Sequence, residues 1–249
     1  QRQMCIRDRF DTLQSTNVTA VDLAKNGAAE GTVIVAETQE GGRGRMKRVW
    51  NSPKGGLWFS IILRPQIDPQ YAAQITLLTG VTVAKALRKL YETEKVMIKW
   101  PNDLLLDGKK ICGILSEMQL DENGNVDYAV VGVGINVALA KDAFPRELQD
   151  VATSLNESLN KKYTCDQVLD QVLSELKELY DKWLCRGAKV ILEPWRALNC
   201  TLDKKVHVKD NDEVIFSGTV IGINEYGAIV VDDGNGNTQV YDFGEISLR

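Results

Sequence analysis

A basic, glycine-rich segment at residues 39–50 (QEGGRGRMKRVW) is the part of the sequence best suited to hold a charged ligand. It places Arg43, Arg45, Lys47 and Arg48 close together in a chain whose formal net charge is −4. Like charges repel, and glycines raise the entropic cost of ordering a loop, so this composition favours a site for an anion. Arginine side chains bind carboxylates and phosphates through two parallel hydrogen bonds. The segment therefore predicts a site for a carboxylate beside a polyphosphate, with a solvated basic loop as the alternative.

A second polar cluster follows an apolar segment that is predicted to form a strand. Lys99 ends this segment and Pro101 interrupts it, which places Asn102 and Asp103 at the mouth of the expected sheet. Side chains of these types suit a phosphate or a magnesium ion, and ordinary turn chemistry is the alternative. An Asp-Gly turn that follows predicts a hairpin, which brings Lys110 toward the same edge.

Several common catalytic patterns are missing from the sequence. The glycine-arginine segment is not followed by Gly-Lys-Ser or Gly-Lys-Thr, and Gly132-Val133-Gly134 lacks the third glycine of a dinucleotide fingerprint. His207 is the single histidine, which argues against Ser/His catalysis. The remaining cations, glycines and amides suit phosphoryl or nucleotidyl transfer, in which the substrates supply the reacting groups.

Length and composition limit the class of protein. The chain has 249 residues, a mass of 27.7 kDa and 44% hydrophobic residues, enough for one good core and a small second domain. Its pI near 5.3 argues against general nucleic-acid binding, and no apolar run approaches the roughly 20 residues that span a bilayer. Five cysteines without a C-x-x-C pair favour reduced thiols and a cytoplasmic location. Residues 1–9 begin without Met and show no periodicity, so we expect them to be non-native or disordered.

The elements that must position the polar residues follow from hydrophobic periodicity. The pattern predicts an α/β (α+β) catalytic domain with a mixed sheet and flanking helices. Strands are expected at residues 32–38, 57–63, 96–100, 104–106, 110–119 and 128–136, and helices at 18–25, 71–91 and 165–185. Short alternating strands at 206–208, 214–216, 219–223, 228–231 and 239–241 then predict a small all-β barrel. This change of pattern divides the chain into residues 1–198 and 199–249.

Six motifs, taken in order, resemble those of the biotin protein ligase family, the biotin–[acetyl-CoA carboxylase] ligases. They are Ser-Thr-Asn at 15–17, Thr-Gln-Glu-Gly-Gly-Arg-Gly-Arg at 38–45 with Arg48 and Trp50, Lys-Trp-Pro-Asn-Asp at 99–103, Lys-Lys-Ile-Cys-Gly-Ile-Leu at 109–115, Gly-Val-Gly-Ile-Asn at 132–136 and Gly-Glu-Ile-Ser-Leu-Arg at 244–249. The likeness runs from about Phe10 to Arg249. Each motif alone is weak, whereas all six in this order are highly specific.

The resemblance implies a fold, a reaction and a set of site residues. It implies an α/β catalytic domain followed by an SH3-like barrel, formation of biotinyl-5′-AMP from biotin and ATP with magnesium, and transfer of biotin to one lysine of a biotin carboxyl carrier protein. Biotin binding is implied for Ser15, Thr16, Asn17, Gln39, Gly42, Arg43, Gly44, Arg45, Lys110 and Gly113. ATP binding is implied for Arg45, Arg48, Trp50, Lys99, Asn102, Asp103 and Asn136, with Lys110 and Arg45 as catalytic residues and Asp103 as a magnesium ligand.

Two alternatives to a biotin ligase stay open on the sequence. A lipoate or octanoate ligase or transferase has the same catalytic architecture, and a non-catalytic biotin sensor would bind the ligand without transferring it. The arginine-rich segment and the terminal motif favour biotin, and Lys110 favours chemistry over binding alone.

The sequence departs from the family pattern at two places. Lys47 stands where the family commonly has glycine, and a positive φ there would cost about 1 kcal/mol and alter how the loop closes. Nine residues precede Phe10, so the helix-turn-helix domain of some members is not expected, nor is binding to operator DNA. We also predict that residues 40–50 are mobile without ligand, and a homodimer is a possible assembly.

Overall fold

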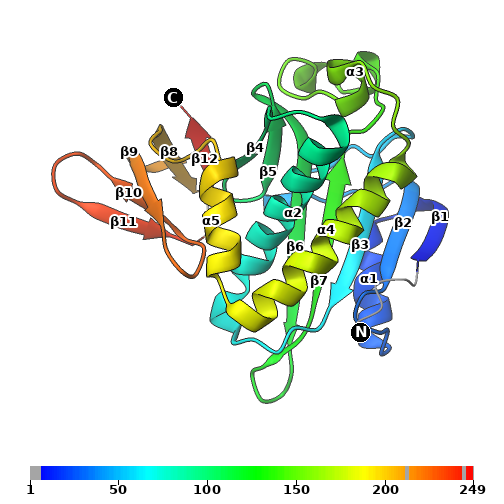
Figure 1. Ribbon diagram of the computed structural model, residues 1–249, viewed down its shortest axis with the longest axis horizontal. Helices are drawn as coiled ribbons and strands as arrows, with labels where there is room; N and C mark the ends of the chain where they lie inside the picture. The colour runs from blue at the N-terminus through cyan, green and yellow to red at the C-terminus, as the bar shows by residue number, and fades with distance from the viewer. Residues whose placement is uncertain (1–6, 211–212, 243–244, 249) are drawn as a thin grey trace.

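The computed structural model describes residues 7–210, 213–242 and 245–248 (Figure 1). Cys5 and, in the terminal motif, Gly244 and Arg249 lie outside the described residues. The described chain forms a seven-stranded sheet flanked by helices and a five-stranded sheet beside it. Within these ranges, no helix is both long and apolar enough to cross a membrane.

The larger sheet is mixed, as predicted, with the strand order β1-β2-β3-β7-β6-β5-β4. β1 and β2 are parallel, and the other neighbouring pairs are antiparallel. The strands span Arg7–Leu13 (β1), Val33–Gln39 (β2), Leu57–Leu63 (β3), Val96–Lys99 (β4), Asp103–Leu106 (β5), Lys109–Leu120 (β6) and Val126–Ile135 (β7). β3 is buried at every position because both faces of the sheet are covered, which explains why its sequence is apolar at every position except Ser60.

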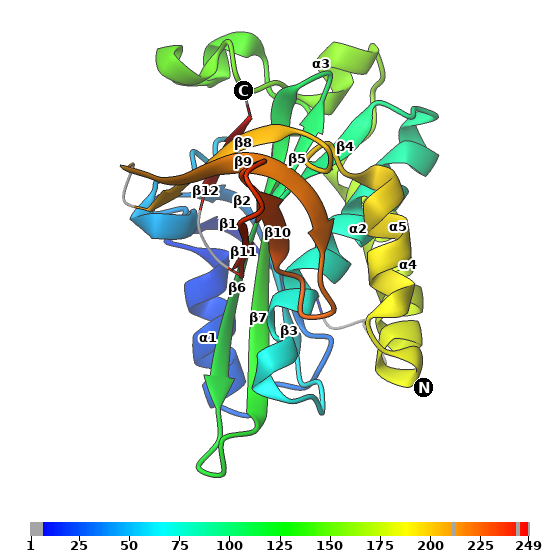
Figure 2. The same ribbon diagram turned by 90° about the vertical axis from the view of Figure 1, so that its left-hand side faces the viewer.

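The helices cover both faces of the larger sheet (Figure 2). α1 (Thr16–Lys25) packs on one face, and α2 (Ala73–Tyr91), α4 (Cys165–Arg186) and α5 (Lys189–Leu198) pack on the other. α2 contacts the sheet, α4 and α5, which explains why its buried positions extend around most of the helix. A short helix, α3 (Leu155–Leu159), follows a segment with two turns of 3₁₀ helix.

The predicted all-β unit is confirmed as an antiparallel sheet with the strand order β11-β10-β9-β8-β12. Its strands span Lys205–Asp210 (β8), Glu213–Ile223 (β9), Ile229–Asp232 (β10), Thr238–Tyr241 (β11) and Glu245–Leu248 (β12). The inward-facing residues Val206, Val220 and Ile246 belong to the same buried cluster as the core of the larger sheet. The division at residues 198 and 199 stays a prediction, because the apolar core continues across it.

Three expectations about secondary structure were wrong. Residues 7–9 belong to β1, which pairs with β2 and is held to α4 by the ion pairs Arg7–Asp170 and Arg9–Asp166, so they are not a disordered start. The two strands expected at 214–216 and 219–223 are one strand, β9, whose register slips by a residue against each neighbour. The pattern also missed α5, a helix that contains Pro194.

Candidate active site

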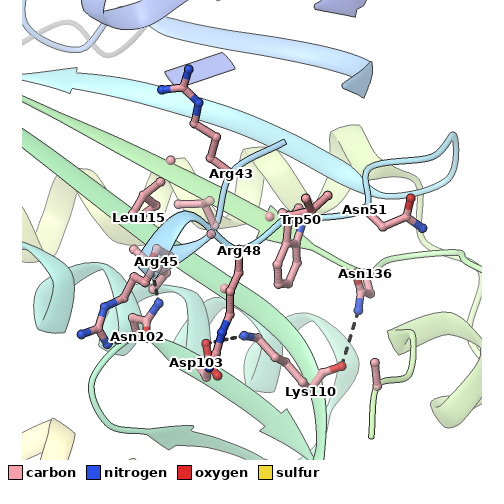
Figure 3. Close-up of a pocket in the computed structure, with 18 of the residues that line it drawn as sticks. Arg43, Arg45, Arg48, Trp50, Asn51, Asn102, Asp103, Lys110, Leu115 and Asn136 are labelled. Carbon is pink, nitrogen blue, oxygen red and sulfur yellow. Dashed lines mark hydrogen bonds and ion pairs between the residues drawn. The ribbon is translucent and has the colours of Figure 1, made fainter. Parts of the chain in front are cut away.

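A cavity of about 610 Å³ lies over the end of the larger sheet where β2, β4 and β7 end and β5 and β6 begin (Figure 3). Its volume is in the usual range for sites that bind small molecules. The predicted residues that line it are Ser15, Thr16, Asn17, Gln39, Arg43, Gly44, Arg45, Arg48, Trp50, Lys99, Asn102, Asp103, Lys110, Gly113 and Asn136. The structure therefore brings together motifs that are up to 121 positions apart, from residue 15 to residue 136.

One part of the cavity wall is polar but carries no formal charge. It begins at Ser15, which has extended backbone, lines the cavity and directly precedes α1. The N–H of Thr16 donates to Gln39 Oε1 at 2.8 Å. Asn17 lies against Gly132, where a Cβ would be 1.9 Å from Asn17 Oδ1. Only glycine at position 132 leaves space for the Asn17 side chain.

The basic segment between β2 and β3 folds back on itself as a small hairpin. Gly44 N donates to Arg48 O at 2.7 Å across this hairpin. At its tip, Met46 and Lys47 have positive φ angles of 53° and 59°. The backbone of Lys47 is therefore left-handed, which is the condition under which this residue strains the loop, and Met46 shares the strain. The predicted mobility of this segment without ligand stays a prediction.

Gly42 is the predicted binding residue that does not line the cavity. A Cβ at this position would lie 2.3 Å from Trp50 O and 2.7 Å from Ser52 Oγ. The Gly42 carbonyl accepts a hydrogen bond from Trp50 N at 2.9 Å. Gly42 therefore allows the two sides of the hairpin to approach each other and supports Trp50 from behind the cavity wall.

The indole of Trp50 lies across β6 and β7, above two glycines that pair in the sheet. A Cβ on Gly134 would lie 2.4 Å from Trp50 Nε1, and a Cβ on Gly113 would lie 2.9 Å from Trp50 Cζ3. Lys110 Nζ lies 5.1 Å from the centre of the ring, within the range of a cation–π contact. The glycines of the Gly-Val-Gly stretch thus provide space for side chains and do not bind a dinucleotide.

The charged part of the cavity is organised around an ion pair. Lys110 Nζ lies 2.7 Å from Asp103 Oδ1, and the two side chains are 34% and 21% exposed. Arg48 extends toward this pair, whereas Arg43 extends in the opposite direction (Figure 3). Arg45 Nη1 donates to Asn102 Oδ1 at 3.2 Å, which fixes the guanidinium beside the turn between β4 and β5.

The balance of charge in the cavity favours an anionic ligand. The lining includes one carboxylate, Asp103, and five cationic side chains, Arg43, Arg45, Arg48, Lys99 and Lys110. Over the described ranges, no three His, Cys, Asp or Glu side chains gather to hold a metal ion by themselves. Burial raises the pKa of the nearby Cys112 thiol, so this thiol stays protonated and is a poor nucleophile.

The chain matches known proteins over most of its length. Residues 10–136 match the model of the biotin/lipoate A/B protein ligase family, and residues 201–249 match the biotin protein ligase C-terminal domain. The bifunctional ligase/repressor BirA of Bacillus subtilis is 38% identical over 232 residues, which are 93% of this chain and 70% of that protein. The chain belongs to the biotin protein ligase family.

Two further family members match over nearly the whole chain. The biotin–[acetyl-CoA-carboxylase] ligase of Mycobacterium tuberculosis is 28% identical over 246 residues, covering 96% of this chain and 88% of that protein. The structure of the Aquifex aeolicus biotin protein ligase in complex with biotin and ATP superposes with a TM-score of 0.82 at 29% identity, covering 98% and 99% of the two chains. The likeness to the family thus includes both sheets.

In this biotin protein ligase, Asn136 connects the cavity to the segment that precedes α3. Its Nδ2 donates to Thr153 O at 3.0 Å and to Lys110 O at 3.4 Å. Lys110 N donates to Val151 O at 2.8 Å, and Thr153 N donates to Lys110 O at 3.0 Å. Both backbone groups of Lys110 are therefore held by residues 151–153, and Asn136 fixes that segment in place.

Sequence reasoning missed two sources of cavity residues. One is the segment before α3 and the other is the small sheet, and together they contribute Phe144, Leu148, Val151, Ala152 and Ile246. The segment before α3 has no periodicity that would predict a place near Lys110. Ile246 belongs to the terminal motif that supports the family resemblance, so that motif could have indicated a residue of the cavity.

Proposed function

We propose that this chain joins biotin to ATP, forming biotinyl-5′-AMP and pyrophosphate, and then transfers the biotinyl group to a lysine of a biotin carboxyl carrier protein. The observation that carries the proposal is that one cavity is lined by a neutral polar wall, five cationic side chains and one carboxylate. The neutral wall suits the ureido ring of biotin. The cations suit a carboxylate beside a polyphosphate. Membership of the biotin protein ligase family supports the same assignment.

In the first step, a carboxylate oxygen of biotin attacks the α-phosphorus of ATP. The new oxygen–phosphorus bond forms as the bond to the β-phosphate oxygen breaks, and the electron pair leaves with pyrophosphate. Lys110 attracts the carboxylate and stabilises the charge that develops at the α-phosphate. Asp103 holds the ammonium group at 2.7 Å, so Lys110 is oriented before the substrates arrive. We assign Arg45 and Arg48, which line the same cavity, to the phosphate oxygens.

In the second step, the neutral amine of the acceptor lysine attacks the carbonyl carbon of the adenylate. The carbon–nitrogen bond forms and the bond between the acyl carbon and the phosphate oxygen breaks. AMP leaves with that electron pair, and the amine gives up one proton, which leaves on the phosphate of AMP. No protein nucleophile is needed, which agrees with the protonated Cys112 thiol. The hairpin of residues 42–50 covers the cavity and keeps water from the reactive acyl phosphate.

The residues present fit a magnesium ion only together with the nucleotide. Mg²⁺ usually binds one or two carboxylates and completes its shell with phosphate oxygens and water. Asp103 supplies one carboxylate on the cavity wall, and the phosphates of ATP would supply further oxygens. The ion would neutralise charge on the phosphates when bound.

The remaining predicted roles concern the nucleotide. We assign Trp50, Asn102 and Asn136 to ATP because they line the cavity near Lys110 and Asp103 (Figure 3), and we assign Lys99, which also lines the cavity, to the same ligand. Lys99 pairs with Asp103 in the sheet register, which places its cation at the same edge. The cytoplasmic location, the carrier protein as partner and the absence of nucleic-acid binding stay predictions.

Intact-mass analysis of an apo carboxyl carrier domain tests the proposed function. The domain is incubated with this protein, ATP and magnesium, and biotin and lipoate are supplied in separate reactions. We expect a mass increase equal to one biotinyl group in the biotin reaction alone. An increase with lipoate alone would indicate the related lipoate activity, and no increase with biotin still bound would indicate a sensor.

A further inference from the structure

Ser60 lies on β3 directly behind the neutral wall of the cavity, and no motif in the sequence pointed to it. It is 0% exposed, and its hydroxyl contacts two residues of the wall. Ser60 Oγ lies 2.6 Å from Asn17 Oδ1 and 2.8 Å from Thr16 Oγ1. Because a serine hydroxyl has one proton, it can donate to only one of these oxygens.

The surroundings of Asn17 decide which oxygen receives that proton. Asn17 Nδ2 lies 3.2 Å from Leu115 O and 2.7 Å from Glu117 Oε2, and a backbone carbonyl can only accept. The amide nitrogen therefore faces Leu115, and the amide oxygen faces Ser60. An amide oxygen also can only accept, so Ser60 donates to Asn17. The 2.8 Å contact between Thr16 and Ser60 then requires Thr16 to donate to Ser60.

The other neighbour of Thr16 is also an acceptor. Gln39 Oε1 accepts from Thr16 N at 2.8 Å, which fixes this atom as the amide oxygen, and it lies 3.1 Å from Thr16 Oγ1. Because Ser60 can only accept from Thr16, the hydroxyl proton of Thr16 is used inside the protein, in the 2.8 Å contact with Ser60, which is shorter than the 3.1 Å contact with Gln39. Thr16 lines the cavity, so a ligand that reaches its hydroxyl oxygen meets lone pairs and no proton.

We propose that Ser60 is a positioning residue that keeps the Thr16 hydroxyl a hydrogen-bond acceptor, and so selects a head group that presents an N–H at this point. The inference rests on the proposed function, because the ureido ring of biotin supplies N–H groups there. The dithiolane ring of lipoate offers no N–H at this point. A biotin analogue with a ring oxygen in place of the N–H would bring that oxygen against the lone pairs of Thr16 and be repelled. If the Thr16 hydroxyl donated to the ligand instead, Thr16 Oγ1 and Ser60 Oγ would lie 2.8 Å apart without a proton between them.

The test measures binding of biotin and of two analogues, in each of which one ureido N–H is replaced by oxygen to give a cyclic carbamate. Titration calorimetry without ATP gives the dissociation constants for the wild type, Ser60→Ala and Thr79→Val. Thr79 is the matched control, because its buried hydroxyl donates to Ile75 O within α2, away from the cavity. We expect the wild type to bind one carbamate at least about 100-fold more weakly than biotin, since a site built for a donor rejects a ligand without it.

In Ser60→Ala, the ratio of the carbamate dissociation constant to the biotin dissociation constant should fall at least about tenfold. The freed Thr16 hydroxyl can then rotate and donate to the ring oxygen of the carbamate. Thr79→Val should keep the wild-type ratio. Equal affinities of the wild type for biotin and both carbamates, or an unchanged ratio in Ser60→Ala, would overturn the inference even if biotin affinity itself fell. Ser60→Cys gives a second measurement if Ser60→Ala does not fold, because a thiol is a weak donor and acceptor and should also narrow the ratio. No biotin binding by the wild type would instead overturn the proposed function, and this inference with it.

Discussion

Lys110 is held in place at both its side chain and its backbone. Its ammonium group is paired with Asp103 at 2.7 Å and lies over the Trp50 ring. Its backbone N–H and carbonyl are held by Val151 and Thr153. A side chain fixed at both ends loses little entropy when it binds a carboxylate, which is the arrangement expected of a group that stabilises a transition state.

Lys110→Ala should therefore slow adenylate formation by at least about 100-fold, a typical cost of removing one preorganised donor. The measurement is the rate of pyrophosphate release in a single turnover with biotin and ATP. Lys109→Ala is the matched control, because this neighbour on β6 is exposed and does not line the cavity. A rate in Lys110→Ala close to that of Lys109→Ala would remove Lys110 from the first step.

Lys47 is a residue whose backbone conformation opposes its side chain. With a φ of 59°, it occupies a region that costs a non-glycine residue about 1 kcal/mol or more. Lys47→Gly should therefore favour the folded hairpin and slow the release of the adenylate several-fold. Lys47→Ala removes the same charge but keeps the strain, so its release rate should stay near or above that of the wild type. Release of the adenylate is followed by filter binding with radiolabelled biotin. Equal release rates in Lys47→Gly and Lys47→Ala, both different from the wild type, would show that the charge of Lys47 and not its backbone strain decides how long the adenylate is retained.

At the scale of elements, the sheet makes space for the site by leaving out side chains. Gly134→Ala would place a methyl group 2.4 Å from Trp50 Nε1, so the indole must move away from β7. We expect the KM for ATP to rise at least about tenfold, since a displaced positioning group weakens binding and rate, with little change in the fold. Gly222→Ala is the control, because a Cβ there meets no atom within 4 Å. The KM for ATP is measured by steady-state kinetics for both variants. An unchanged KM in Gly134→Ala would show that Trp50 does not hold the nucleotide.

The elements also show which parts of the structure the sequence could predict. β3 and the hairpin at Asp107-Gly108 were predicted because local chemistry determines them, through an apolar run and two residues with positive φ. β1 was missed because it is polar and mostly exposed, and it forms only by pairing with β2 and α4. The wall residue Ser60 was missed for the same kind of reason, since its role depends on contacts with residues 43 and 44 positions away in the chain.

At the scale of the whole molecule, the small sheet is packed into the rest of the protein. Its buried residues join the main core, and Ile246, 1% exposed, also lines the cavity. Trp100 Nε1 donates to Gly227 O at 3.1 Å, so the strand-turn segment that carries Asn102 and Asp103 is attached to the small sheet. The position of the site residues therefore depends on the small sheet being in place.

This dependence predicts that the two sheets unfold together. Ile246→Ala should lower the free energy of unfolding by about 2–5 kcal/mol, the usual cost of truncating a buried isoleucine, and it should weaken substrate binding because the cavity wall is lost. Val240→Ala on β11 removes a side chain that is 59% exposed, so it should change stability by no more than about 0.5 kcal/mol. Scanning calorimetry and tryptophan fluorescence should report one coincident transition for the wild type and both variants. Two separate transitions, or an Ile246→Ala protein as stable as Val240→Ala, would show that the small sheet is an independent unit and that the continuous core does not couple it to the site.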